Sequence, residues 1–162
     1  MNNKLLSLDE IEDKLKFLKD KGKKIVHCHG VFDLFHIGHL KHLKAAKEFG
    51  DILIVSVTAD IYVNKGPERP AFNEKYRAEI LTSLEIVDYV IINEWPSAVE
   101  ILQKIKPHYY VKGSDYKVRD RNTNNNIFIE EETCQRIGTK MVYTDEYSSS
   151  STKLLNKYFH LV

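Results

Sequence analysis

Two histidines separated by an isoleucine and a glycine, His36 and His39, are the strongest chemical signal in the chain. They follow a short apolar run, residues 25–29, which breaks at Gly30, so a strand, a tight loop and a helix start are expected in that order. Unpaired backbone N–H groups and the helix dipole favour anions at such a helix start. Imidazoles add donors that can be charged near neutral pH. We therefore expect an active site that handles phosphate.

Three further segments combine cations, glycines or hydroxyls, and each of them follows an apolar run. They are Lys65-Gly66-Pro67-Glu68-Arg69-Pro70, Lys112-Gly113-Ser114-Asp115-Tyr116 and the serine-rich stretch 145–152. In a parallel sheet the carboxyl ends of the strands lie along one edge, where ligands bind. All four segments are therefore expected to meet at one site.

The residue types in these segments suit direct displacement at the α-phosphate of a nucleoside triphosphate, where donors and positive charge stabilise the developing charge. No serine–histidine–acid or cysteine–histidine set is legible, so a covalent enzyme intermediate is not expected. Lys65 and Arg77 are candidates to hold the leaving pyrophosphate or an acceptor phosphate. Arg77 lies in the first turn of a predicted helix, which disfavours a cation, so we expect an anionic partner for it. A glutamate on the same helix is the alternative partner.

Strands alternate with helices along the chain. Strands are expected at 24–29, 51–58, 88–93, 108–111 and 140–143, and helices at 8–21, 37–49, 73–84, 96–106, 128–137 and 153–159. Ser7 and Glu10 form a capping box for the first helix, and the third helix has Tyr76, Ile80, Leu81 and Leu84 as its apolar face. The pattern predicts an α/β fold: one Rossmann-like domain with a five-stranded parallel sheet, helices on both faces and an extra N-terminal helix. Residues 1–23 would be that helix, and 24–162 the catalytic core.

Composition excludes several classes of protein. The chain has 162 residues, of which 43% are hydrophobic, and its 24 Lys+Arg against 23 Asp+Glu argue against a nucleic-acid partner. No apolar run approaches the roughly 18 residues of a membrane helix, and no signal-peptide pattern is present, so we expect a cytoplasmic protein without a membrane partner. The two cysteines are too few for a disulfide framework.

A metal site is the alternative interpretation of the histidine-rich stretch. Its candidate ligands are His27, Cys28, His29, His36, His39 and His42. Neighbouring residues of a strand point to opposite faces, so the first three cannot converge, and the last three lack a fourth ligand at zinc-site spacing. We therefore expect no metal held by the protein alone.

The stretch Gly30-Val31-Phe32-Asp33 followed by His36-Ile37-Gly38-His39 resembles the signature of the HxGH nucleotidyltransferase superfamily, the cytidylyltransferase-like proteins. The resemblance runs from Ile25 to the last helix and is closest to the adenylyltransferase domain of bifunctional heptose-phosphate kinase/adenylyltransferases, which make ADP-heptose. Glycerol-3-phosphate cytidylyltransferases are similar but more distant. The other matching pieces are Lys65-Gly66, Arg69-Pro70, Arg77, Val111-Lys112-Gly113, Asp115-Tyr116 and Ser150-Ser151-Thr152.

The resemblance implies catalytic roles for His36, His39 and Lys65. It implies nucleotide binding by Gly30, Val31, Phe32, His36, Gly38, His39, Lys112, Gly113, Asp115, Ser150, Ser151 and Thr152. It also implies that Asp33, Lys65 and Arg77 bind the acceptor or its phosphate, although ordering of the loop by Asp33 is an equal alternative. Mg²⁺ would accompany the triphosphate.

The function implied is transfer of a nucleoside monophosphate from ATP to a phosphorylated sugar, a heptose 1-phosphate, with release of pyrophosphate. Cytidylyltransferases have an arginine before their serine–threonine run, and its absence from residues 145–149 favours ATP over CTP. The alternatives are a CTP-dependent enzyme acting on glycerol 3-phosphate or another polyol phosphate, and a non-catalytic nucleotide-binding module. A separate sugar kinase would supply the acceptor, unless the chain is one domain of a longer bifunctional enzyme. A homodimer is also expected, with the N-terminal helix as a candidate contact.

Overall fold

The five predicted strands form one parallel sheet in the order β3-β2-β1-β4-β5 in a computed structural model, which describes residues 4–116, 125–145 and 150–159. The strands are β1 (Ile25–Gly30), β2 (Ile52–Thr58), β3 (Tyr89–Asn93), β4 (Tyr109–Lys112) and β5 (Lys140–Tyr143). The helices are α1 (Leu8–Asp20), α2 (Ile37–Lys47), α3 (Glu74–Thr82), α4 (Val99–Ile105), α5 (Asn125–Ile137) and α6 (Ser151–Phe159), with short 3₁₀ turns at Asp60–Tyr62 and Ser114–Tyr116. The predicted α/β fold is confirmed.

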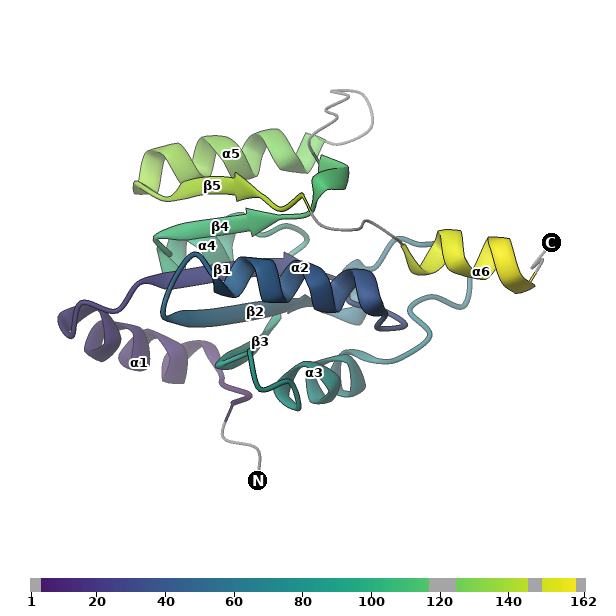
Figure 1. The fold of residues 1–162 in the computed structure, drawn as a ribbon, viewed down its shortest axis with the longest axis horizontal. Coiled ribbons are helices and arrows are strands. Elements are labelled where there is room, and N and C mark those ends of the chain that lie inside the picture. The colour runs from purple at the N-terminus through teal and green to yellow at the C-terminus, as the bar shows by residue number, and fades with distance from the viewer. Residues whose placement is uncertain (1–3, 117–124, 146–149, 160–162) are drawn as a thin grey trace.

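Side-chain alternation along the strands divides the core into two layers, one on each face of the sheet (Figure 1). Cys28 of β1 packs with residues of α2 and α3, such as Leu43. Ile25, on the other face of β1, packs with residues of α1, α4 and α5, such as Ile101. The predicted placement of helices on both faces is therefore confirmed.

The N-terminal helix α1 braces its own sheet. The predicted capping box is present: Ser7 Oγ accepts from the Glu10 N–H at 3.3 Å, and the Glu10 carboxylate accepts from the Ser7 N–H at 2.7 Å. Ile11 is fully buried in the core, and the Leu6 N–H donates to the Val90 carbonyl of β3 at 3.0 Å. The inner face of α1 is therefore occupied by the chain itself.

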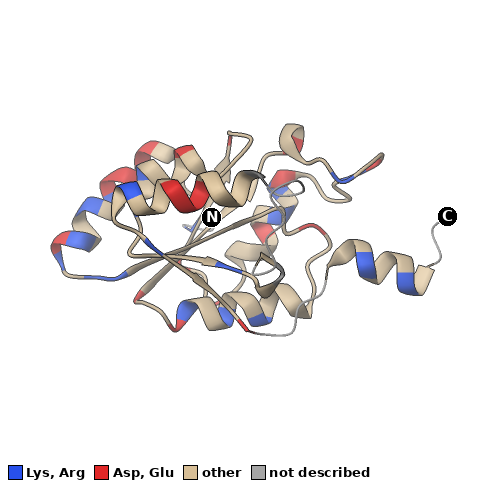
Figure 2. Ribbon diagram, turned by 90° about the horizontal axis from the view of Figure 1, so that it is seen from above, with Lys and Arg blue, Asp and Glu red and all other residues tan. Residues whose placement is uncertain are grey.

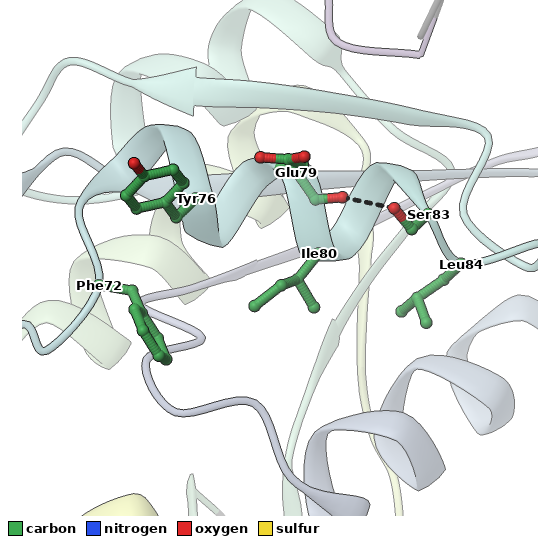
Figure 3. A pocket seen from close by; sticks show the side chains of 6 residues that line it. All are labelled: Phe72, Tyr76, Glu79, Ile80, Ser83 and Leu84. Carbon is green, nitrogen blue, oxygen red and sulfur yellow. Dashed lines mark hydrogen bonds between the residues drawn. The ribbon is translucent and has the colours of Figure 1, made fainter.

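The outer side of α3 departs from the prediction. Leu81 is fully buried, but Tyr76 is 58% exposed. With Phe72, Ile80 and Leu84, Tyr76 lines an open, mostly apolar hollow of about 640 Å³ on the outer side of the helix (Figure 3). Residues four apart on a helix form a stripe of their own, about 100° away from that of the next residue. The predicted single apolar face is therefore two stripes. Leu81 is buried in the core, whereas in the other stripe Leu84 packs against the core only in part, and Tyr76 is exposed.

The serine-rich stretch does open the last helix, since α6 begins at Ser151. This helix stands out from the body of the molecule (Figure 1) and has Lys153 and Lys157 but no acidic residue (Figure 2). Within residues 4–116, 125–145 and 150–159, no helix is both long and apolar enough to cross a membrane.

Candidate active site

The loop between β1 and α2 is held in place by the buried carboxylate of Asp33. It accepts from the backbone N–H groups of Ala71 at 3.0 Å and Phe72 at 3.2 Å, and it pairs with Arg69 Nε at 2.8 Å. Burial alone would raise the pKa of Asp33, but these donors lower it below its ordinary value, so the group stays ionised. The contacts match the loop-ordering alternative for Asp33 rather than binding of an acceptor.

The same loop holds a strained backbone. Phe32 and Leu34 have positive φ angles of 53° and 49°, which cost a non-glycine residue about 1–2 kcal/mol each. The Phe32 ring folds back over Gly30, where an added Cβ would lie 3.2 Å from the ring. A side chain at position 30 would press on this ring, so glycine lets the loop lie close to the end of β1.

Backbone N–H groups at the start of α2 fix the protons of the two motif histidines. His36 is the N-cap of α2, and its Nδ1 accepts from the Gly38 N–H at 3.1 Å, while the His36 N–H donates to His39 Nδ1 at 3.4 Å. The two rings stack with their centroids 3.8 Å apart. Because each Nδ1 is an acceptor, each neutral imidazole must have its proton on Nε2. Both side chains therefore present N–H donors.

These donors stay neutral, and that of His36 lacks a partner within the described protein. Burial, followed by the neighbouring charges of His36 and Lys65, lowers the pKa of His39 to about 3. His36 Nε2 is buried and has no hydrogen-bond partner among the described residues. A buried N–H without a partner is costly, so its presence indicates a ligand that accepts from it.

The expected sheet-edge site contains a hollow of about 210 Å³, which we call the histidine cavity. The predicted site residues that line it are Gly30, Val31, Phe32, His39, Lys65, Lys112, Gly113, Ser150 and Ser151. Tyr116, from the predicted segment 112–116, also lines it, and so do His29 and His42, to which no role in the site was assigned from the sequence. The four segments singled out from the sequence therefore do meet at one place.

Arg69 ties three of these segments together. Its Nε binds Asp33 in the β1–α2 loop, and its Nη2 donates to Ser151 Oγ at the start of α6 at 2.9 Å. Lys65, in the same loop as Arg69, has a pKa lowered by burial and by the charge of Arg69. Sequence reasoning recognised Arg69 only as part of a matching, positively charged loop, because its partners lie far away along the chain.

Lys112 lies at the end of β4 within a buried ionic network. Its Nζ is 3.1 Å from the Glu130 carboxylate and 3.3 Å from the Tyr110 hydroxyl, and it sits 4.3 Å from the centroid of the Tyr116 ring. Burial would lower the pKa of Lys112, but Glu130 and Tyr116 raise it above its ordinary value. The lysine therefore stays charged, and Glu130 of α5 is a partner that no motif revealed.

Arg77 has a different position from the one expected of a phosphate ligand. Its guanidinium is fully buried and donates to the carbonyls of Val31 at 2.6 Å, Thr58 at 2.8 Å and Phe72 at 2.9 Å. The anionic partner is the Asp60 carboxylate at 2.6 Å, which belongs to the protein. Arg77 lines neither the histidine cavity nor its neighbour, so it holds the loops from behind.

Replacement of Arg77 by methionine is expected to lower the free energy of unfolding by about 3–5 kcal/mol, since carbonyls and a carboxylate lose their buried partner. Urea denaturation measures this loss, and Lys75→Met on the exposed side of the same helix is the matched control. If Arg77→Met has the stability of wild type and a raised KM for a phosphate substrate, Arg77 binds phosphate as predicted from the sequence.

A second hollow of about 180 Å³, which we call the α5 cavity, adjoins the first on the α4/α5 face of the sheet. The two share His29, Gly30, Val31, Lys112 and Tyr116. The remaining wall of the α5 cavity comes from Thr58, Tyr62, Pro96, Ser97, Asn126, Ile127 and Glu130. Sequence reasoning missed this cavity because its residues come from separate segments without a motif.

Several residues of the predicted site take no part in these walls. Neither cavity is lined by His36, Asp33 or Arg77. Gly38 is buried within the first turn of α2, and Thr152 is exposed on α6. The side chain of Asp115 lies outside the described residues, and so do residues 146–149, where the absent arginine was noted.

The described residues do not form a magnesium site of their own. Mg²⁺ prefers oxygen ligands, and carboxylates above all. Of the carboxylates described around the two cavities, Asp33 pairs with Arg69 and Glu130 pairs with Lys112. No group of three or more His, Cys, Asp or Glu side chains in the described part of the chain could hold a metal ion.

Comparison with known proteins gives a family for most of the chain. The family described as cytidylyltransferase-like matches residues 27–156. Bifunctional protein HldE of Aliarcobacter butzleri (strain RM4018) is 46% identical over 121 residues, which are 74% of this chain and 25% of that protein. Bifunctional protein HldE of Geobacter metallireducens is 40% identical over 115 residues, 70% of this chain and 24% of that protein. The chain thus spans about a quarter of the length of these relatives.

Two solved structures share the fold. The lipopolysaccharide core biosynthesis protein from Thermoplasma volcanium GSS1 has a TM-score of 0.64 and 28% identity, covering 78% of this chain and 100% of that one. Pantoate-beta-alanine ligase from Francisella tularensis has a TM-score of 0.63 over 91% of this chain and 68% of its own, at 17% identity. The second likeness supports the fold alone.

Proposed function

This chain belongs to the cytidylyltransferase-like family, and we propose that it transfers a nucleoside monophosphate from ATP to a phosphorylated sugar with release of pyrophosphate. The expected nucleotidyltransferase domain is confirmed by the family match and by the HldE relatives. One observation supports the chemistry above all: the stacked imidazoles of His36 and His39 are both neutral Nε2–H donors, and His39 lines the histidine cavity together with Lys65. Such preorganised donors stabilise charge that develops on a phosphoryl group.

In the proposed mechanism the triphosphate occupies the histidine cavity. His36 and His39 donate to oxygens of the α-phosphate, while Lys65 and Ser151 hold the β- and γ-phosphates that leave. An oxygen of the acceptor phosphate forms a bond to the α-phosphorus, and the bond from that phosphorus to the bridging oxygen of the β-phosphate breaks, releasing pyrophosphate. Positioning and electrostatics supply the rate, without a covalent enzyme intermediate.

We place the acceptor in the α5 cavity. The acceptor phosphate must reach the α-phosphorus, and the two cavities share the wall formed by Gly30 and Val31. The charged Lys112 also borders both cavities and is placed to attract either phosphate.

A heptose 1-phosphate is the acceptor we propose. The motifs resemble those of heptose-phosphate adenylyltransferases, and the T. volcanium relative is named for lipopolysaccharide core biosynthesis.

Mg²⁺ would be bound by the oxygens of the triphosphate and by water, since the nearby carboxylates of the protein are paired. A sugar kinase, on another chain or another part of a longer one, would supply the acceptor. The homodimer stays a prediction, and the inner face of α1 is not its contact.

Pyrophosphate release separates the candidate functions. The chain is incubated with ATP or CTP and each of heptose 1-phosphate, other sugar 1-phosphates and glycerol 3-phosphate. We expect the fastest release with ATP and heptose 1-phosphate. Preference for CTP and glycerol 3-phosphate would favour the cytidylyltransferase alternative. Nucleotide binding without release from any pair would leave a binding module.

A further inference from the structure

Besides the Lys112–Glu130 pair, a chain of polar side chains runs along the α4/α5 face of the sheet, from its interior to the α5 cavity. His27 Nε2 lies 2.8 Å from Ser56 Oγ, and the same oxygen lies 2.8 Å from His29 Nδ1. His29 Nε2 then lies 3.4 Å from Thr58 Oγ1, on the cavity wall. The interior of a parallel sheet is normally apolar, and this chain has no part in the phosphate chemistry described above.

The hydrogen bonds of this chain have one consistent direction. His27 Nδ1 is buried and has no hydrogen-bond partner among the described residues. A buried lone pair without a partner is tolerated better than a buried N–H, so the proton of His27 belongs on Nε2, where it is donated to Ser56 Oγ. The Ser56 hydroxyl is then free to donate to His29 Nδ1. The proton of His29 must therefore lie on Nε2, at the cavity.

Both histidines keep these protons over the neutral pH range. Burial, followed by the charge of Lys112, lowers the pKa of His29 to about 3. Burial also lowers the pKa of His27 well below its ordinary value. Neither ring takes up a second proton near pH 7, so His29 has one uncharged N–H donor at the cavity, and its partner in the free protein is Thr58 Oγ1 at 3.4 Å.

We propose that His29 is a specificity-determining residue, whose Nε2–H donates to a hydroxyl of the uncharged part of the acceptor. Ser56 and His27 are positioning residues that fix this tautomer from behind. The inference rests on the proposed function, because it assumes an acceptor that has both a phosphate and hydroxyl groups. His29 Nε2 lies beside Thr58 Oγ1, a group of the α5 cavity alone, so its N–H is placed toward the acceptor rather than toward the triphosphate.

The surroundings of His29 support a hydroxyl-rich ligand. The side chains of Thr58, Ser97 and Asn126 add neutral hydrogen-bonding groups to the α5 cavity. The two charged groups on its wall, Lys112 and Glu130, are paired with each other. The cavity therefore offers several uncharged partners for a sugar ring and little net charge away from its junction with the histidine cavity.

Steady-state kinetics with ATP and heptose 1-phosphate test the proposal through Ser56→Ala. Ser56 is fully buried and lines neither cavity, so its loss acts on the acceptor only through His29. We expect the KM for the acceptor to rise about 3- to 10-fold, the range of one neutral hydrogen bond, with kcat and the KM for ATP within about 2-fold of wild type. Thr133→Ala, which removes another fully buried hydroxyl on α5, is the matched control and should leave all three unchanged.

Deoxy acceptors add a second comparison. Wild type should discriminate by about 3- to 10-fold against the analogue that lacks the hydroxyl bound by His29, and His29→Phe should lose this discrimination. A His29→Phe enzyme that still discriminates at every deoxy position would overturn the role of His29. A rise in the KM for ATP in place of that for the acceptor would assign the α5 cavity to the nucleotide, and would overturn it as well.

A long-range ¹H–¹⁵N spectrum of the free protein tests the tautomers without turnover. The imidazoles of His27 and His29 should both show the Nε2–H pattern, and Ser56→Ala should change the pattern of His29. An Nδ1–H pattern for His29 in wild type contradicts the proposal. If wild type releases no pyrophosphate with any acceptor, the proposed function is wrong and the hydroxyl contact is wrong with it. If wild type is active and Ser56→Ala and His29→Phe have unchanged kinetics, only the role of His29 is wrong.

Discussion

Replacing His39 by alanine is expected to lower kcat by about 10²- to 10³-fold, the loss that follows removal of one preorganised donor from a charge-stabilising site. The Nε2–H of His39 is such a donor, because its Nδ1 is engaged by the His36 N–H. Pyrophosphate release at saturating ATP and acceptor measures the change. The KM for ATP should change less than kcat, since the contact strengthens as charge develops in the transition state.

The alanine variant also loses a helix cap, so its fold must be examined separately. His39→Asn keeps a side-chain oxygen that can accept from the His36 N–H but lacks the Nε2–H, so we expect it to be as inactive as alanine and more stable by about 1 kcal/mol. Lys44→Ala, on the exposed side of the same helix, should leave kcat unchanged. A folded His39→Asn enzyme with the kcat of wild type would rule out the proposed role of His39.

The elements around this site were predictable because each is specified locally. The strands are dense in apolar, β-branched residues, and the helix starts have caps that can be recognised from residue type, such as Ser7 and Asn73. One of the two largest shifts is at α4, which begins at Val99 rather than at residue 96; the other is at α5, which begins at Asn125 rather than at residue 128. At the start of α4 the Val99 N–H donates to Ser97 Oγ at 3.3 Å, so Pro96 and Ser97 form the turn before the helix.

Contacts between distant segments were not predictable from the same patterns. The ion pair of Arg69 with Asp33 joins loops 36 residues apart, and that of Lys112 with Glu130 joins a strand to a helix beyond residues 117–124. Arg77 is the clearest example of a residue whose partner could not be identified from the sequence. The expectation of an anionic partner was sound electrostatics, but only the folded chain shows that Asp60 supplies it.

Acidification is expected to destabilise the protein from pH 6.5 downward, because buried histidines of the site must take up protons to unfold. The pKa of both His29 and His39 is lowered to about 3, and that of His42 to about 4, chiefly by burial. Each unfolded histidine titrates near 6.5. Between these values the unfolded state binds protons that the folded state does not, so the stability that is complete above pH 6.5 is lost as the pH falls.

The size of this effect follows from the number of protons. Each histidine contributes a slope of about 1.4 kcal/mol per pH unit within the window, so three contribute at most about 4 kcal/mol per pH unit. Solvent at these half-buried rings brings the slope below that limit. Urea unfolding at pH 7.5, 6.5, 5.5 and 4.5 measures it, and we expect the unfolding reaction to take up at least two protons near pH 5.

The variant His42→Phe measures how much one histidine contributes to the pH dependence of the free energy of unfolding. His42→Phe removes a titrating group whose Nδ1 lies 3.0 Å from Thr144 Oγ1, and it should reduce the proton uptake near pH 5 by about one. Lys44→Ala, on the exposed side of the same helix, is the matched control and should leave the uptake unchanged. Fewer than one proton taken up by wild type would mean that these histidines are charged in the folded protein. His36 and His39 would then be cationic ligands of the phosphate, and the neutral-donor chemistry proposed for them would have to be abandoned.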